Sequence, residues 1–262
     1  CVGQVTSVGS SVQDVHVNDW VVPASNDVGT LTEYVVTDAA NVQVVPNDIN
    51  VADAALLGGT GATALRLISD FPNNGVIVQN AANSPVGQAV IQIAKAKGIK
   101  TINIIPDGGD EGATVQHLKD LGADIVVNTS YSNNINFKNL LSDVDAPTLG
   151  INGAGGRAST SVVRTVGEGG TVVTYGGSSS IEIPTGALVS KGISLNGFSL
   201  PRWNGSASAQ ERQSMADELA GLVQNGDLKS TVSKTKFSDF ITNLDNFGAS
   251  DPQSVSATLV TM

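Results

Sequence analysis

The fold is decided by the stretch Val76-Ile-Val-Gln-Asn-Ala-Ala-Asn-Ser-Pro-Val-Gly87-Gln-Ala-Val-Ile-Gln-Ile-Ala-Lys-Ala-Lys-Gly98. It begins with a short apolar run that predicts a buried strand, passes through a turn of small residues, and ends in a pattern that predicts an amphipathic helix. A second strand is predicted over residues 101–105, one helix later, as a βαβ unit requires. Free N–H groups and the positive end of a helix dipole at such a turn favour a phosphate, so the stretch predicts a dinucleotide-binding fold.

The same alternation of strands and helices continues through the middle of the chain. Strands are predicted over 76–79, 101–105, 125–128, 149–152, 171–175 and 193–198. Helices are predicted over 54–68, 86–97, 113–121 and 158–166, and a polar loop over 128–136. Short helices between strands rich in Val and Ile are typical of a doubly wound parallel sheet, so we expect an α/β fold of the Rossmann type.

The sequence on either side of this region has a different pattern. Strands predicted over 3–8, 20–23 and 32–36 suggest part of a small barrel, with Tyr34 packed on the third strand. A helix over 208–224 and a strand over 255–261 are expected to return to this first region. The expected domains are therefore 1–52, 53–204 and 205–262. The chain opens within a strand pattern and without Met, so we expect residues to be missing upstream.

Composition argues against several kinds of function. The net charge is −10, with 24 acidic and 14 basic residues and no cluster of Lys and Arg, so we expect no nucleic-acid partner. No apolar run reaches the length of a membrane span, so no membrane association is expected. A single cysteine, Cys1, and two histidines, His16 and His117, argue against a metal centre. We expect His117 to be a solvated surface residue.

Three motifs in this framework are Gln79-Asn-Ala-Ala-Asn-Ser-Pro-Val-Gly-Gln-Ala-Val-Ile-Gln-Ile-Ala94, Asn152-Gly-Ala-Gly-Gly156 and Gly169-Gly-Thr-Val-Val-Thr-Tyr-Gly-Gly177. They resemble those of the mitochondrial trans-2-enoyl thioester reductases, zinc-free members of the medium-chain dehydrogenase/reductase superfamily. The similarity covers nearly the whole chain, because Val2-Gly-Gln-Val and Asp19-Trp-Val-Val-Pro-Ala24 match the family's GroES-like barrel.

The resemblance implies an activity and a setting. These enzymes reduce the trans-2 double bond of an enoyl thioester in fatty acid synthesis, with NADPH as the hydride donor. The substrate is carried by coenzyme A or an acyl carrier protein. The resemblance also implies a homodimer, joined at the edge strand near residues 193–198, and a place in the mitochondrial matrix; without the resemblance, a cytoplasmic protein is expected.

The resemblance further assigns cofactor contacts to individual residues. The pyrophosphate turn would comprise Asn83, Ser84, Pro85, Val86 and Gly87. Pro85 stands where the family usually has Gly or Ala, and proline lacks an N–H for phosphate although it suits the first turn of a helix.

Other assignments concern the nicotinamide half of the cofactor and the substrate. Tyr175, Gly176 and Gly177 match the segment beside the nicotinamide. Phe198 matches a position that lines both cofactor and acyl chain, and Trp203 follows it as a substrate-lining residue. The family's catalytic tyrosine lies upstream of Cys1 by this match, so we assign no catalytic residue.

The segment after the second strand departs from the family. The family has an Arg-Asp-Arg-like group there, whose forked donors suit the 2′-phosphate of NADPH. This chain has Pro106-Asp-Gly-Gly-Asp110 instead. Asp107 or Asp110 would repel a phosphate and accept from a ribose diol, which favours NADH as an alternative cofactor. Solvated loop charges are the other interpretation of these two residues.

Two alternative functions stay open on the sequence alone. One is a quinone-oxidoreductase-like enzyme, which shares the expected fold and lacks zinc. The other is a non-catalytic protein that has kept the fold and lost the chemistry.

Overall fold

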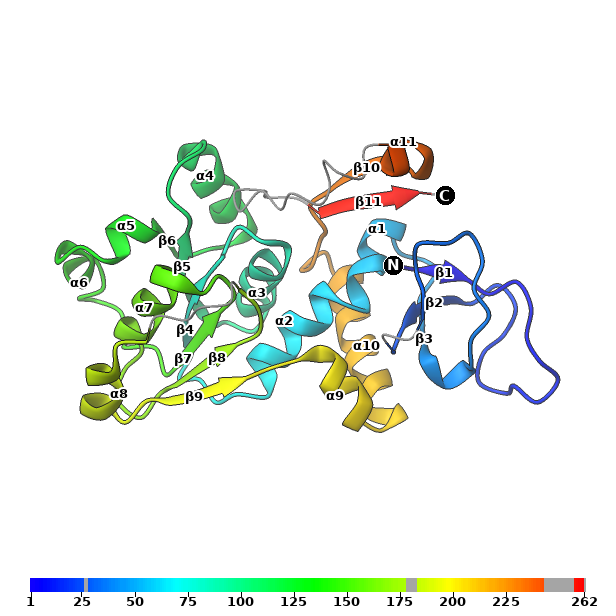
Figure 1. Ribbon diagram of the computed structural model, residues 1–262, viewed down its shortest axis with the longest axis horizontal. Coiled ribbons are helices and arrows are strands. Elements are labelled where there is room, and N and C mark those ends of the chain that lie inside the picture. The colour runs from blue at the N-terminus through cyan, green and yellow to red at the C-terminus, as the bar shows by residue number, and fades with distance from the viewer. Residues whose placement is uncertain (26–27, 178–182, 243–256, 262) are drawn as a thin grey trace. The chain divides into compact units, whose positions relative to one another are not determined.

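The computed structural model describes residues 1–25, 28–177, 183–242 and 257–261 (Figure 1). The chain divides into two compact units. One is Arg66–Phe198, and the other contains Cys1–Leu65 together with the described residues after Phe198. The expected boundaries near 53 and 205 therefore differ from the structural ones. The reason is that α1 (Val51–Leu57) packs on α10 (Ala209–Gln224) and on β2 (Trp20–Pro23), which keeps it with the first unit.

The unit Arg66–Phe198 is built on a six-stranded parallel sheet of order β6-β5-β4-β7-β8-β9. The strands are β4 (Val76–Asn80), β5 (Lys100–Ile105), β6 (Ile125–Asn128), β7 (Leu149–Asn152), β8 (Thr171–Thr174) and β9 (Ser194–Gly197). Numbered within this unit, the order is 3-2-1-4-5-6, which is that of dinucleotide-binding sheets. The predicted Rossmann-type sheet is confirmed.

Helices cover both faces of this sheet (Figure 1). They are α3 (Pro85–Ala96), α4 (Glu111–Leu121), α6 (Asn136–Leu140), α7 (Gly156–Thr165) and α8 (Thr185–Lys191). One core, around Ile91, Ile105 and Leu118, lies under α3 and α4. The other, which contains Ile104 and Val162, lies under α6 and α7. Neighbouring residues of a strand point to opposite faces, so Ile104 and Ile105 enter different cores.

The polar loop expected over 128–136 contains a short helix, α5 (Thr129–Ser132), and leads into α6. The Asn128 side chain accepts a hydrogen bond from Tyr131 N at 2.7 Å and so caps α5. Composition alone predicted a loop here because Asn and Ser favour caps and turns over helix interiors.

The helix predicted over 54–68 is broken into α1 and α2 (Thr60–Ser69), which are bent by 47°. A Cβ on Gly58 would lie 2.8 Å from Val22 Cβ, so the chain approaches β2 closely at the break.

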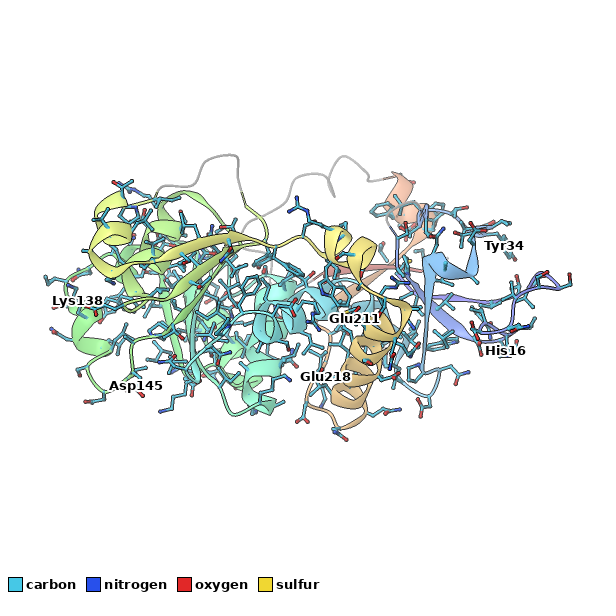
Figure 2. All side chains as sticks on the ribbon, turned by 90° about the horizontal axis from the view of Figure 1, so that it is seen from below. His16, Tyr34, Lys138, Asp145, Glu211 and Glu218 are labelled. Carbon is cyan, nitrogen blue, oxygen red and sulfur yellow. The ribbon has the colours of Figure 1, made fainter. Side chains whose placement is uncertain are left out.

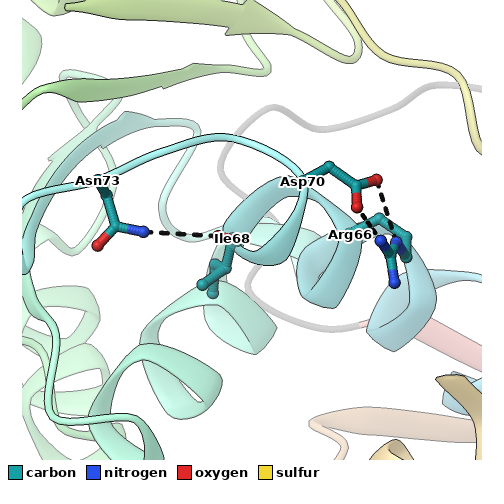
Figure 3. A network of polar contacts seen from close by, with 4 residues as sticks. All are labelled: Arg66, Ile68, Asp70 and Asn73. Atoms are coloured by element: carbon teal, nitrogen blue, oxygen red, sulfur yellow. Dashed lines mark hydrogen bonds and ion pairs between the residues drawn. The ribbon is translucent and has the colours of Figure 1, made fainter. Parts of the chain in front are cut away.

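At the other end of α2, Arg66 pairs with Asp70, and Asn73 Nδ2 donates to the Ile68 carbonyl at 3.5 Å (Figure 3). Among the described residues no single helix is long and apolar enough to span a membrane, although the bent pair α1 and α2 together meets that length and composition.

The other unit contains two small sheets. The first is antiparallel, in the order β1 (Gly3–Gln4), β2 and β3 (Val42–Val45), and the 3-10 helix η1 (Ala39–Asn41) leads into β3. The second pairs β10 (Val232–Lys236) with β11 (Ala257–Thr261) in parallel. The helices are α1, most of α2, α9 (Leu200–Ser206), α10 and α11 (Phe237–Thr242).

Sequence prediction was least accurate in this unit. The strand expected over 3–8 is only two residues long, the one expected over 32–36 is wrong, and β3 was missed. Tyr34 is 77% exposed rather than packed (Figure 2). Residues 32–36 have no pairing strand within the described part of the chain, and an alternating pattern does not hold a strand without a neighbour.

Candidate functional site

The strand order of the six-stranded sheet reverses between β4 and β7. In open α/β sheets, ligands bind beside the carboxyl ends of the strands at such a switch point. Three turns follow those ends, namely 80–85 after β4, 152–156 after β7 and 174–177 after β8. We refer to these three turns as the carboxyl edge.

Two fully buried asparagines join the turns of the carboxyl edge. Asn80 Nδ2 donates to Asn152 Oδ1 at 2.7 Å, and Asn80 Oδ1 accepts from Gly153 N at 2.7 Å and Ala154 N at 3.1 Å. Asn152 Oδ1 also accepts from Gly155 N at 3.2 Å, and its Nδ2 donates to Thr174 Oγ1 at 3.1 Å. The two side chains therefore satisfy the backbone of the β7 turn and fix β4, β7 and β8 at their ends.

Tyr175 lies across the same edge. Its backbone N donates to the Asn152 carbonyl at 3.1 Å, and its side chain shares a hydrogen bond with Ser84. A Cβ on Gly153 would overlap the Tyr175 hydroxyl, so the ring occupies space that only glycine leaves open. Burial raises the pKa of Tyr175, and the hydrogen bond from Ser84 offsets part of that rise.

The amino end of α3 faces the carboxyl edge with a defined cap. Ser84 is the N-cap, and its Oγ accepts from Gly87 N at 3.1 Å. Pro85 occupies the first turn and brings no N–H. The Val86 N–H has no partner within the described residues, so it and the helix dipole are what this turn offers an anion.

Close packing holds this turn in place. A Cβ on Gly87 would lie 2.5 Å from the Ala81 carbonyl oxygen and 2.7 Å from Ala82 Cα, so the helix lies directly on the turn. Ala81 itself has φ of 50°, a left-handed conformation that is uncommon outside glycine. The five residues expected to form a pyrophosphate turn are thus gathered in one tight structure.

A second layer of contacts supports the turn from α4. Gln88 Nε2 donates to the Asn83 carbonyl at 2.8 Å, and His117 Nε2 lies 3.1 Å from Gln88 Oε1. The expectation that His117 is a solvated surface residue is wrong, because it is half-buried and contacts α3. Sequence reasoning missed this contact since Gln88 and His117 lie on different helices, 29 positions apart.

The loop after β5 carries three carboxylates, each held by a neighbouring donor. Asp107 Oδ1 accepts from Ser130 N at 2.9 Å, and Asp110 caps α4 by accepting from Ala113 N at 2.9 Å. Glu111, which sequence reasoning did not single out, accepts from Gly108 N and from Asn128 Nδ2, both at 2.9 Å. Asp107 and Asp110 are exposed, and the loop lies where β5 ends beside β4.

The remaining predicted residues divide between the two units. Gly177 has φ of 118°, and a Cβ there would lie 2.8 Å from the Ala154 carbonyl carbon, so it and the exposed Gly176 bring the β8 turn against the β7 turn. Phe198 is half-buried just beyond β9, and its N donates to the Thr174 carbonyl at 2.9 Å. Trp203 lies on α9 in the other unit.

The other unit contains a small cavity of about 120 Å³. Its lining residues are Cys1, Pro23, Ser25, Gly58, Gly59, Leu200, Pro201 and Asn204. Within the described parts of both units, no group of three or more His, Cys, Asp or Glu residues is placed to hold a metal ion.

Comparison with known proteins identifies the family. A model of the zinc-binding dehydrogenase family matches residues 85–220. The mitochondrial enoyl-[acyl-carrier-protein] reductase of Dictyostelium discoideum is 40% identical over 245 residues, which are 91% of this chain and 70% of that protein. The chain belongs to the mitochondrial enoyl-[acyl-carrier-protein] reductase family. The rat enzyme of this family is 42% identical over 87% of this chain, and the match spans 62% of that enzyme's length.

Solved structures agree with this family at the level of the fold. The complex of Etr1p with NADP and crotonyl-CoA has a TM-score of 0.86 and 22% identity, covering 100% of this chain and 78% of that one. An Etr1p/Etr2p heterodimer from Candida tropicalis has a TM-score of 0.82 and 22% identity, with coverages of 94% and 76%. A quinone oxidoreductase of Pseudomonas syringae has a TM-score of 0.82 and 25% identity, with coverages of 100% and 80%. The reductase fold is therefore shared by more than one kind of medium-chain reductase.

The Asn80 side chain is expected to be essential to the carboxyl edge. Asn80→Ala leaves Gly153 N and Ala154 N without an acceptor and leaves Asn152 Oδ1 with Gly155 N as its remaining donor, which costs about 2–4 kcal/mol of unfolding free energy. Urea unfolding measures this loss, and Asn139→Ala, on the exposed face of α6, serves as the matched control. Equal stability of the two variants would contradict the role given to Asn80.

The raised pKa of Tyr175 predicts a pH dependence of stability. The folded chain keeps the phenol proton to a higher pH than the unfolded chain. The contribution of Tyr175 to the free energy of unfolding is therefore fully present below the ordinary pKa of 10.0, and it declines as the pH rises beyond that value. Subtracting the alkaline absorbance titration of Tyr175→Phe from that of the wild type isolates the ionisation of this phenol. The midpoint of the difference curve should lie above pH 10.0. A Tyr131→Phe control should keep the high-pH step, and a difference midpoint at or below the ordinary value would refute the buried position.

Proposed function

We propose that this chain reduces the trans-2 double bond of an enoyl thioester, with a reduced nicotinamide dinucleotide as hydride donor. The observation that carries the proposal is the set of three turns joined by Asn80, Asn152 and Tyr175 at the switch point, in a chain of the enoyl reductase family. The relatives' names support the thioester substrate, and the Etr1p complex with NADP and crotonyl-CoA supports the cofactor class.

The residues of the carboxyl edge fit a dinucleotide. The pyrophosphate would accept from the Val86 N–H at the positive end of α3, within the turn formed by Asn83, Ser84 and Pro85. Gly87 lets the helix approach closely enough for this contact. The nicotinamide half would lie along Tyr175, Gly176 and Gly177 toward Phe198. When bound, a reduced nicotinamide supplies the hydride to the β-carbon of the thioester.

Protein groups have two tasks in such a reaction. A donor must stabilise the charge that develops on the thioester oxygen, and a proton must reach the α-carbon. In the family a tyrosine that precedes the segment matching Val2-Gly-Gln-Val has a catalytic role, so we propose no described residue for it. Tyr175 is half-buried and shares a hydrogen bond with Ser84, and we propose that it positions the α3 cap rather than transferring a proton.

Turnover of crotonyl-CoA against a quinone separates the candidate functions. We expect oxidation of reduced nicotinamide to depend on crotonyl-CoA, to fall at least about tenfold in Asn80→Ala, and to persist in Asn139→Ala. Turnover of the quinone without the thioester would favour the quinone reductase alternative, which the similarity to the Pseudomonas syringae fold motivates. Binding of dinucleotide with turnover of neither substrate would favour a non-catalytic protein.

We also propose a homodimer joined at β9. This strand is the edge of the six-stranded sheet, all four of its residues are exposed, and Leu195 is 42% exposed. An unprotected edge strand is a ready template for pairing with a second copy. Light scattering should give a dimer for wild type and a monomer for Leu195→Lys, whereas Val189→Lys on α8 should remain dimeric. A monomeric wild-type chain would contradict this interface.

The relatives are named as mitochondrial proteins, and we propose the mitochondrial matrix for this chain as well. Subcellular fractionation tests this location, and recovery in the cytosolic fraction alone would contradict it.

A further inference from the structure

The loop after β5 stands where a dinucleotide-binding sheet distinguishes its two cofactors. In such sheets an acidic residue about twenty positions after the glycine-rich turn accepts from the 2′-hydroxyl of NADH, whereas an arginine accommodates the 2′-phosphate of NADPH. Asp107 follows Gly87 by about that separation and comes two residues after β5 ends. β5 pairs in parallel with β4 as far as Ile104, so the loop that carries Asp107 begins beside the end of β4.

The carboxylates of this loop are fixed in place. Ser130 N holds Asp107 from the turn after β6, and Asp110 is engaged at the amino end of α4. Glu111 joins Gly108 N to Asn128 Nδ2, which ties the loop to the end of β6. Ser130 N engages Oδ1 of Asp107, and a carboxylate accepts about four hydrogen bonds in all.

The charged side chains of the loop and the start of α4 are all acidic. Asp107, Asp110 and Glu111 fall within residues 106–118, and neither that segment nor residues 128–137 after β6 contains a Lys or an Arg. A phosphate monoester carries a charge near −2 at neutral pH. Placed beside these carboxylates it is repelled, whereas a neutral 2′-hydroxyl is not.

We infer that this chain selects NADH over NADPH and that Asp107 is the residue that makes the selection. The inference rests on the proposed function, because it concerns the cofactor of that same site. It separates this chain from an NADP-binding neighbour such as Etr1p, whose fold it shares.

Calorimetric titration with NAD⁺ and NADP⁺ tests the inference without turnover. We expect NAD⁺ to bind the wild-type chain at least about tenfold more tightly than NADP⁺. Asp107→Asn keeps the shape of the side chain and an oxygen for Ser130 N but removes the charge, so it should narrow this ratio at least about threefold. Asp145→Asn, an exposed residue before the opposite end of β7, removes the same charge from the same unit and should leave the ratio unchanged (Figure 2). The ratio of the wild-type affinities for NAD⁺ and NADP⁺ should also decrease as the salt concentration is raised, because the selection is electrostatic.

The outcomes separate this inference from the proposed function. Binding of NADP⁺ as tight as that of NAD⁺, or tighter, overturns the inference and leaves the proposed reductase in place. A preference for NAD⁺ that Asp107→Asn does not narrow overturns the role of Asp107. Failure of both dinucleotides to bind a chain that melts cooperatively overturns the proposed function and the inference with it.

Discussion

The buried amide pair of Asn80 and Asn152 is the contact on which the rest of the site depends. Each side chain accepts from backbone N–H groups of the turn after β7, and each donates across to the next strand. Buried polar groups are stable only when they are satisfied, so the pair holds only one arrangement of β4, β7 and β8. That constraint places three turns at one edge before any ligand is considered.

Small residues then let those turns approach one another. Gly87 brings α3 onto the β4 turn, Gly153 leaves space for the Tyr175 ring, and Gly177 brings the β8 turn against Ala154. Tyr175 in turn reaches Ser84, the cap of α3. The amide pair and the glycines therefore act together. The asparagines fix the strand ends, and the glycines determine the distance between the end of α3 and the strands. A helix dipole acts over about one turn, so this distance decides whether the end of α3 affects a bound anion.

The sequence predicted the central sheet well because its signal is local. Strands β4 to β8 are short and rich in Val, Ile or Leu, and all neighbouring strands of the sheet are parallel, so local composition and the spacing of helices were sufficient. The failures have different physical causes. Residues 32–36 alternate like a strand, yet strand formation depends on a partner that periodicity does not reveal. Gln88 and His117 meet only because α3 and α4 pack side by side, and a contact between two helices leaves no signature in either one.

In the candidate site as well, features with a local sequence signal were predicted and contacts between distant residues were missed. The turn that opens α3 was predicted from one stretch because Ser84, Pro85 and Gly87 lie close together in the sequence, and the local rules for helix caps apply to them. Glu111 was missed because its importance comes from Gly108 and Asn128, which reach it from the loop and from β6. The sequence likewise does not predict the contact between Asn80 and Asn152, since the two residues are 72 positions apart.

Backbone and side chains have separate roles in such a site. The positions of the turns that we propose for the pyrophosphate and the nicotinamide follow from main-chain geometry. The preference for NADH that we infer depends instead on side-chain charge in the loop after β5, where Asp107 and Asp110 are exposed and belong to neither core. Asp107→Asn keeps an acceptor for Ser130 N and should change stability little, whereas Asp110 also caps α4. A chain of this family is therefore free to change its cofactor while the asparagine pair and the glycines keep the reaction geometry constant.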